Sequence, residues 1–132
     1  MPSYTKQQNA AMFILRAIIA ATFLYAAYVK LSLWSGMPEG MSVATGNLMK
    51  FLSIVEPLGA AAVLLGFLTR YAATGLSVIM VGAIFFMQFV MGAGFATPVG
   101  VGWNFPLMVL GGCLILVVFG AGDWSVDAQQ KK

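Results

Sequence analysis

Four long apolar runs take up most of this chain and restrict what it can fold into. They cover about residues 10–34, 48–68, 71–91 and 105–120. About 20 apolar residues in a helix cross roughly 30 Å of hydrocarbon, so each run can span a membrane, the fourth with local thinning. With seven Lys or Arg and four Asp or Glu in 132 residues, the chain cannot solvate a water-facing surface. The sequence therefore predicts an all-α polytopic membrane protein, with residues 1–132 forming a single transmembrane domain.

The connections between the runs predict how the helices alternate. Only Thr69 and Arg70 separate the second run from the third, which requires an antiparallel hairpin. The other connections, residues 35–47 and 92–104, contain the glycine and proline residues that end helices. We therefore expect a four-transmembrane-helix bundle with up-down-up-down topology. Glycines spaced by seven, Gly59 with Gly66 and Gly75 with Gly82, predict close helix contacts.

Basic residues predict the orientation of this multi-pass protein. In the expected topology Lys6, Arg70, Lys131 and Lys132 share one side, whereas Lys50 lies on the other. The positive-inside rule then places both termini in the cytoplasm. The isoelectric point near 9.3 is thus explained by topology signals, and we expect no nucleic-acid partner.

Missing residue types exclude several kinds of chemistry. The chain has no histidine, which rules out imidazole metal sites, His-ligated haem and Ser-His-Asp triads within it. The single cysteine, Cys113, rules out an intrachain disulfide and a cysteine-bound iron–sulfur cluster. We expect no metal site, and any redox centre is expected to belong to a partner or a diffusible carrier.

Charged residues inside the apolar runs are the main candidates for a site. Arg16 and Lys30, like Glu56 and Arg70, are 14 residues apart, or about 3.9 helical turns, so each pair shares one helix face. Side chains lean toward the N-terminus of their own helix, so in antiparallel helices Lys30 and Glu56 point toward each other. This predicts a Lys30–Glu56 pair, direct or through one water, with a separation of about 4 Å or less if direct. Arg16 leans the other way, so its stem is expected to snorkel to cytoplasmic water.

Both a functional and a structural interpretation of these charges are open. Ionisable groups within a membrane are functional by default, which makes Glu56, Lys30 and Arg16 candidates for an intramembrane polar site. Buried ion pairs also fix helix register, and basic residues also anchor helix ends. Arg70 is interpreted mainly as a topology anchor. The weaker candidates are Arg70, Tyr28, Gln88 and Asn104.

Three segments carry a resemblance to a known family. They are Arg16 followed by FLYAAYVKL at residues 23–31, EPLG at 56–59 leading to GFLTR at 66–70, and WNFP at 103–106 leading to GAGDWSVD at 120–127. In this order they resemble the DoxX family over about residues 10–128. The resemblance implies a four-helix protein of the bacterial inner membrane. Some relatives are membrane subunits of a thiosulfate:quinone oxidoreductase, and others belong to membrane-associated oxidoreductase assemblies. Relatives commonly have an acidic residue near Asn104 and a histidine near Gln88; this chain has neither, which favours an assembly role over proton handling there.

Three functions follow from these features, and no enzyme activity of the chain's own is assigned. The favoured one is an accessory membrane subunit of a quinone-linked or sulfur-oxidising redox complex, with a quinone head group near Glu56 and Lys30. The second is a non-catalytic structural subunit that stabilises a larger membrane complex. A small transporter ranks last, because the runs provide almost no polar lining. The expected partners are the lipid bilayer, a membrane protein complex and, as an alternative, further copies of this chain.

Overall fold

The computed structural model describes residues 4–98 and 100–130, which are mostly helical. The α-helices are α1 (Lys6–Lys30), α2 (Val43–Leu65), α3 (Thr69–Phe85), α4 (Asn104–Phe119) and α5 (Val126–Gln130). A 3₁₀ turn at Leu31–Trp34 extends α1, and a π-helical turn at Phe86–Val90 extends α3. The two-residue strands β1 (Ala96–Thr97) and β2 (Gly100–Val101) form an antiparallel ladder in a connection that the sequence predicts as a loop.

Three of the helices are long and apolar enough to cross a membrane. They are Lys6–Trp34, Val43–Leu65 and Thr69–Val90, with 29, 23 and 22 residues. The fourth apolar helix, Asn104–Phe119, has 16 residues, so at 1.5 Å per residue it is about 24 Å long. The chain is therefore a helical membrane protein with three helices of spanning length and one shorter apolar helix.

The helix ends differ from the predicted ones for local reasons. Helix α2 begins at Val43 rather than near residue 48, because the side chain of Ser42 accepts a hydrogen bond from the Thr45 backbone and caps it. The turn between α2 and α3 precedes Thr69 instead of containing Thr69 and Arg70. Gly66 ends α2 with φ 72°, and Leu68 also has a left-handed backbone, with φ 49°.

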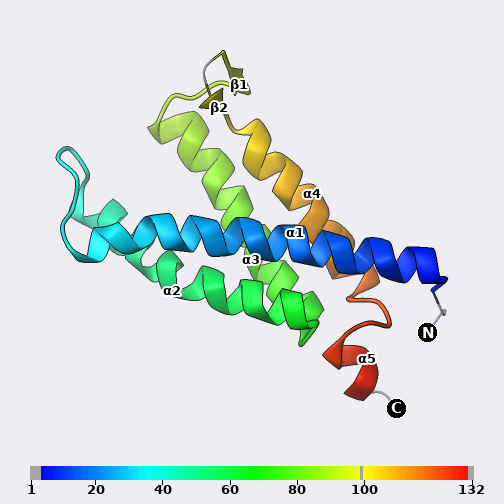
Figure 1. Cartoon of the computed structure of the whole chain (residues 1–132). Helices are drawn as coiled ribbons and strands as arrows, with labels where there is room; N and C mark the ends of the chain where they lie inside the picture. Colours follow the sequence, from blue (N-terminus) through cyan, green and yellow to red (C-terminus); the bar gives the residue numbers. More distant parts are fainter. Residues whose placement is uncertain (1–3, 99, 131–132) are drawn as a thin grey trace.

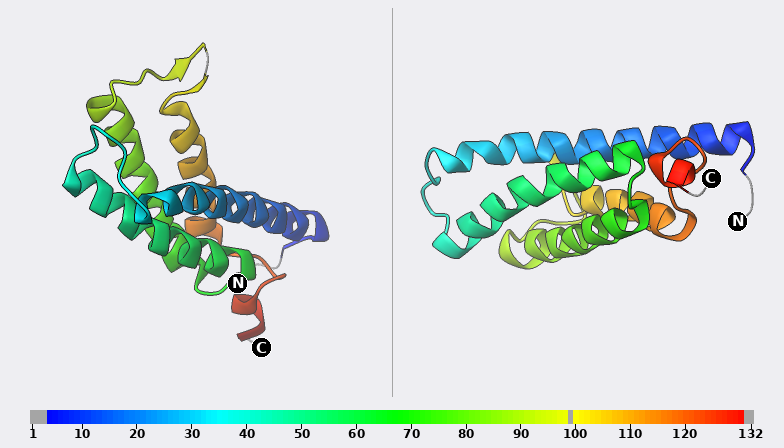
Figure 2. Two further views of the ribbon diagram at one scale, coloured as in Figure 1. Left: turned by 60° about the vertical axis from the view of Figure 1, so that its left-hand side comes forward. Right: turned by 90° about the horizontal axis from the view of Figure 1, so that it is seen from below.

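The four apolar helices, α1 to α4, form two hairpins. Helix α1 packs mainly against α2 and α3 mainly against α4, while the contact between α2 and α3 joins the hairpins. Figure 1 shows that the hairpins diverge toward the end where α1 connects to α2 and α3 connects to α4. At the opposite end the termini, the α2–α3 turn and α5 lie together, as the views in Figure 2 also show. We call this opposite end the terminal end of the bundle.

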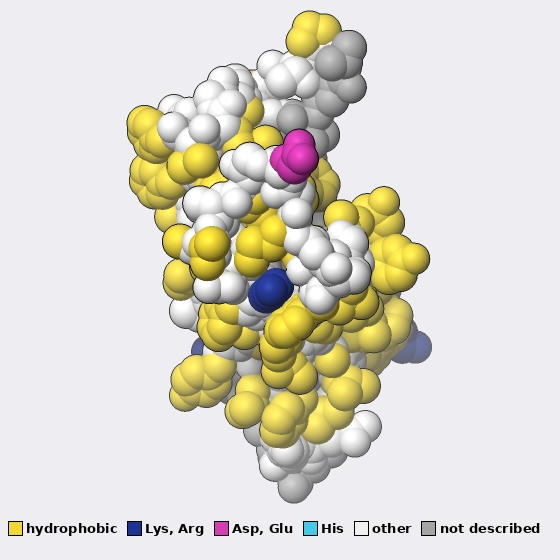
Figure 3. All heavy atoms as spheres, turned by 90° about the vertical axis from the view of Figure 1, so that its left-hand side faces the viewer, with side chains coloured by type: hydrophobic (Ala, Val, Ile, Leu, Met, Phe, Trp, Pro, Cys, Tyr) yellow, Lys and Arg dark blue, Asp and Glu magenta, His cyan; other side chains and the backbone are white. Residues whose placement is uncertain are grey.

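All four apolar helices, α1 to α4, contribute to a small core. Its buried members are Ile19, Ala20, Phe23, Ala60, Val63, Ala73, Leu76, Cys113 and Leu116. Many large apolar side chains remain outside it, and Figure 3 shows that apolar groups dominate one face, with few charges among them. Such a surface is unsuited to water and suited to lipid.

The prediction of close helix contacts is correct for Gly59, whereas Gly66 approaches the segment before α5, and Gly75 and Gly82 have no close contact within the described chain. A Cβ on Gly59 would lie 3.0 Å from Leu76 Cδ2, and one on Gly66 would press on Ser125. Cβ atoms on Gly75 and Gly82 would meet no atom within 4 Å. Gly59 and Gly66 therefore allow close approach inside the chain, whereas Gly75 and Gly82 lie on its open surface.

Candidate functional site

Lys30 and Glu56 form an ion pair between the first two helices. Lys30 Nζ donates to Glu56 Oε1 at 3.1 Å and to Oε2 at 3.3 Å. Lys30 is the last residue of α1, and Glu56 lies in the second half of α2. The contact is within the separation that the sequence predicts, because antiparallel packing makes the two side chains lean toward each other.

The two partners of this pair differ in burial. The Glu56 side chain is 2% exposed, whereas that of Lys30 is 22% exposed. A buried carboxylate inside a membrane costs several kcal/mol unless it is paired or protonated. The ammonium group of Lys30 supplies that pairing, and the Lys30 side chain is the partly exposed member of the pair.

Next to the pair lies an aromatic contact that the sequence argument does not predict. Trp34 Nε1 donates to Ser53 Oγ at 2.9 Å, and Ser53 Oγ donates to the Lys50 carbonyl at 2.6 Å. Lys50 Nζ lies 5.4 Å from the centre of a Trp34 ring. The sequence signal is the position of Trp34 at the end of an apolar run, where membrane-interface tryptophans are common. Trp34 thereby connects the end of α1 to the Glu56 face of α2.

Arg16 lies at the terminal end of the bundle, and the prediction that it snorkels to water is wrong. It is 1% exposed. Its guanidinium donates to four backbone carbonyls at 2.6–3.2 Å: Val63 and Leu64 at the end of α2, and Ala121 and Trp124 beyond α4. The last carbonyls of a helix have no partner within that helix, so a buried guanidinium is a favourable partner for them. Arg16 therefore ties the end of α2 to the segment after α4.

The weaker candidates do not join the Lys30–Glu56 pair. Tyr28 is 72% exposed on α1, and Gln88 is exposed in the π-helical turn. Asn104 Oδ1 accepts from the Gly102 backbone at 3.1 Å, which is a local turn contact. Arg70 is exposed at the terminal end, and Arg16 is 14 residues from Lys30 along α1, or about 21 Å. Of the predicted site residues, the structure brings together Lys30 and Glu56.

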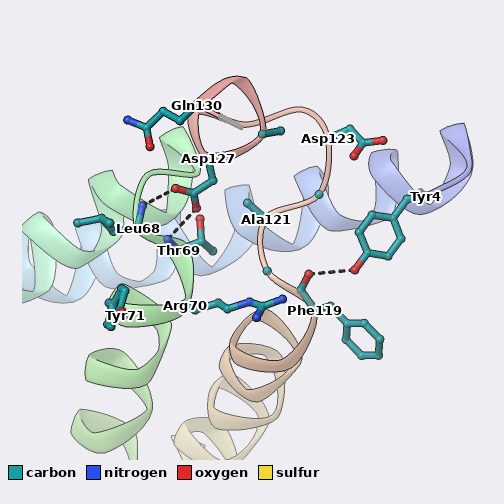
Figure 4. A pocket seen from close by; sticks show the side chains of 13 residues that line it. Tyr4, Leu68, Thr69, Arg70, Tyr71, Phe119, Ala121, Asp123, Asp127 and Gln130 are labelled. Atoms are coloured by element: carbon teal, nitrogen blue, oxygen red, sulfur yellow. Dashed lines mark hydrogen bonds between the residues drawn. The ribbon is translucent and has the colours of Figure 1, made fainter. Parts of the chain in front are cut away.

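Three polar residues that the sequence argument misses hold the C-terminal segment in place. We call residues 120–130 the strap. Asn9 Nδ2 donates to Asp123 Oδ2 at 3.0 Å, and Asn9 Oδ1 accepts from the Asp123 backbone at 2.8 Å. The carboxylate of Asp127 accepts from the backbone of Leu68 at 2.8 Å and of Thr69 at 2.9 Å, as Figure 4 shows. A cap so far away in sequence has no local spacing pattern, which explains why it was missed.

The described residues contain no cluster of three His, Cys, Asp or Glu side chains that could hold a metal ion. Lys30 and Glu56 instead place a hydrogen-bond donor and a proton acceptor side by side within the helical region. This pair is suited to polar ligand oxygens or to proton exchange.

A family model connects this arrangement to known proteins. The DoxX model matches residues 11–89, more than half of the chain. The chain belongs to the DoxX family. The matched region contains most of α1 and all of α2 and α3, and with them Arg16, Lys30, Glu56, Arg70 and Gln88. No curated protein and no solved structure matches this DoxX protein.

Proposed function

We propose that this DoxX protein is an accessory membrane subunit of a redox complex in the bacterial inner membrane. In this proposal α4 is a fourth span in a locally thinned bilayer, and both termini are cytoplasmic. Lys6 and Arg70 support that orientation, because both lie in the first turn of a helix at the terminal end of the bundle. Lys131 and Lys132, which contribute to the same prediction, lie outside the described residues.

The observation that carries the proposal is the Lys30–Glu56 ion pair. Lys30 Nζ can donate a hydrogen bond to a quinone oxygen and stabilise negative charge that develops on it. Glu56, whose Oε1 lies 3.1 Å from Lys30 Nζ, can accept a proton from the reduced head group. These two residues would thus hold a quinone head group, whose own chemistry supplies the electron transfer.

The surroundings of the pair favour a subunit over a self-contained enzyme. The cleft at the terminal end of the bundle and the apolar groove between α2 and α3 are lined by residues other than Lys30 and Glu56. Lys30 is partly exposed, so the pair provides one wall of a site whose other wall a partner subunit would supply. Assembly with that partner would enclose the head group.

The proposal is tested on the complex purified from native membranes in mild detergent. We expect an oxidoreductase to co-purify in fixed stoichiometry. Glu56→Gln and Lys30→Met should lower quinone-linked turnover per assembled complex at least tenfold. Glu39→Gln is the matched control, because it removes an exposed carboxylate from the α1–α2 connection. Full turnover in both pair variants, or a chain that purifies without an oxidoreductase, would refute the proposal.

A purely structural subunit is the second candidate, and the outward-facing glycines favour it. Cβ atoms on Gly82 in α3 and Gly111 in α4 would meet no atom within 4 Å, so a partner helix can approach their backbones closely. In this case deletion of the protein lowers the amount of assembled partner complex while turnover per complex stays unchanged. Measuring both quantities in one preparation distinguishes the two functions.

A further inference from the structure

A cleft of about 570 Å³ opens at the terminal end of the bundle, away from the Lys30–Glu56 pair. It lies between the start of α3, the end of α4 and the strap, with Tyr4 and Tyr71 among its lining residues (Figure 4). Its volume falls within the roughly 300–1,000 Å³ typical of ligand sites. Tyrosines are enriched at the level of the lipid head groups, which is where this end of the bundle would lie.

The exposed charges of the cleft are one cation and one anion. Figure 4 shows the Arg70 side chain extending toward the strap, and the described residues include no ion-pair partner for it. Asp123 is exposed, and one of its oxygens is bonded to Asn9. Asp127 is only partly exposed, and both of its oxygens accept from the start of α3. Arg70 and Asp123 therefore complement a ligand with one negative and one positive group.

A buried hydroxyl provides a second, independent sign of a missing ligand. Thr69 lines the cleft, is 1% exposed, and has no hydrogen-bond partner for its Oγ1. In the described part of the chain it is the only buried side-chain oxygen or nitrogen without one. Leaving such a group unpaired costs about 1–3 kcal/mol. A ligand oxygen that enters the cleft would remove this cost.

An apolar groove of about 490 Å³ continues from the cleft between α2 and α3. The two hollows share Leu68 and Tyr71. The rest of the groove is lined by Val55, Leu58, Gly59, Ala62, Phe67, Ala72, Gly75, Leu76 and Ile79, which carry no polar side chain. A charged cleft that leads into an apolar groove matches an amphiphile with a charged head and a hydrocarbon tail.

We propose that the cleft and the groove together bind one zwitterionic phospholipid with a primary-ammonium head group. Its phosphate lies on Arg70, and its ammonium lies on Asp123. One acyl chain follows the groove past Gly75. A primary ammonium can donate hydrogen bonds to a carboxylate, whereas a choline head group cannot. The site therefore selects phosphatidylethanolamine over both phosphatidylcholine and the anionic phosphatidylglycerol.

The test is native mass spectrometry of the purified full-length chain in detergent, with each of these three lipids added in turn. All three carry the same acyl chains, so only the head group differs. We expect phosphatidylethanolamine to bind most tightly. Arg70→Gln should weaken binding of all three lipids at least tenfold. Lys6→Gln is the matched control, because it removes a charge from the same end of the bundle but outside the cleft. Asp123→Asn should remove the preference for phosphatidylethanolamine.

A second pair of variants tests the groove without removing any contact. Gly75→Leu places a side chain in open space within the groove, and Gly82→Leu does the same seven residues further along, outside the groove. Both replacements favour a helix, so both proteins should fold. Gly75→Leu should displace the lipid, and Gly82→Leu should not. The proposal would be overturned if phosphatidylglycerol bound more tightly than phosphatidylethanolamine. It would also be overturned if the Gly75 and Gly82 variants, or the Arg70 and Lys6 variants, retained lipid equally.

Discussion

Removing Arg16 tests whether one side chain holds the end of α2 and the strap together. Its guanidinium donates four hydrogen bonds to backbone carbonyls at 2.6–3.2 Å while it is 1% exposed. A hydrogen bond to a charged group contributes about 1.5–3 kcal/mol, but burial of the charge offsets much of the total. Arg16→Met leaves the carbonyls of Leu64, Ala121 and Trp124 without this donor, and an unsatisfied buried acceptor costs about 1–3 kcal/mol, so we expect a loss of about 3–5 kcal/mol of unfolding free energy.

The protein's single thiol provides the assay for this loss. Cys113 is 0% exposed in the core, so a thiol-reactive fluorophore reports its release during heating in detergent. A loss of this size lowers the midpoint by roughly 10 °C or more. Arg16→Lys should give an intermediate shift, since an ammonium keeps the charge but lacks the planar set of donors.

Arg70→Met is the control for charge. Arg70 is exposed and lies in the first turn of α3, at the same end of the bundle. Its replacement should change the unfolding free energy by no more than about 0.5 kcal/mol. If the Arg16 and Arg70 variants unfold at the same temperature, the four carbonyl contacts do not stabilise the fold and the reasoning fails.

Three further perturbations follow from the same geometry, and each is read with the Cys113 assay unless stated. Asp127→Ala removes the cap of α3 and should cost about 1–2 kcal/mol; unchanged amide exchange in the first turn of α3 would contradict the capping role. Gly66→Ala puts a methyl group against Ser125 at a residue with a backbone φ of 72°, and should lower the unfolding free energy by at least about 2 kcal/mol. A variant with wild-type stability would show that Gly66 does not have this conformation in the folded protein. Lys30→Met leaves Glu56 buried without its partner and should cost about 3–5 kcal/mol; adding Glu56→Gln should recover part of this, and strictly additive losses would mean that the two residues do not interact.

The sequence predicts those parts of the fold that depend on spacing within one helix or between neighbouring helices. The apolar runs predict the long helices. The position of Lys30 and Glu56 on facing antiparallel helices predicts their contact, because both the periodicity and the lean of the side chains are local properties. The same argument places Arg16 near the terminal end of the bundle correctly.

The contacts of Arg16 depend on parts of the chain that local spacing cannot place. Its acceptors Val63 and Leu64 lie 47 and 48 residues along the chain, and Ala121 and Trp124 lie 105 and 108 residues along. Nothing in the apolar pattern says that the strap folds back across the end of α2. The expectation of an exposed Arg16 fails because protein carbonyls, not water, occupy that position.

The predicted position of the turn before α3 is wrong for a related reason. Leu68 is apolar, so the pattern assigns it to the second span. In the structure it has φ 49° and lies between α2 and α3, outside both helices. A left-handed leucine is unfavourable by itself. It is held by the bond from its backbone to Asp127, 59 residues away. Leu68 and Thr69 also line the cleft, so a sequence pattern that misplaces this turn cannot predict the cleft either.

The placement of Arg16 also has a consequence for biosynthesis. Leu64 is translated 60 residues before Trp124, and both accept hydrogen bonds from the same guanidinium. At about 5–20 residues per second, the ribosome needs roughly 3–12 s to make that interval. During this time the first three helices can enter the membrane while Arg16 holds only part of its final set of acceptors. Until the strap emerges, the nascent chain therefore carries a cation whose hydrogen-bond donors are only partly satisfied, and a quality-control protease could use this difference to recognise chains that still lack the strap.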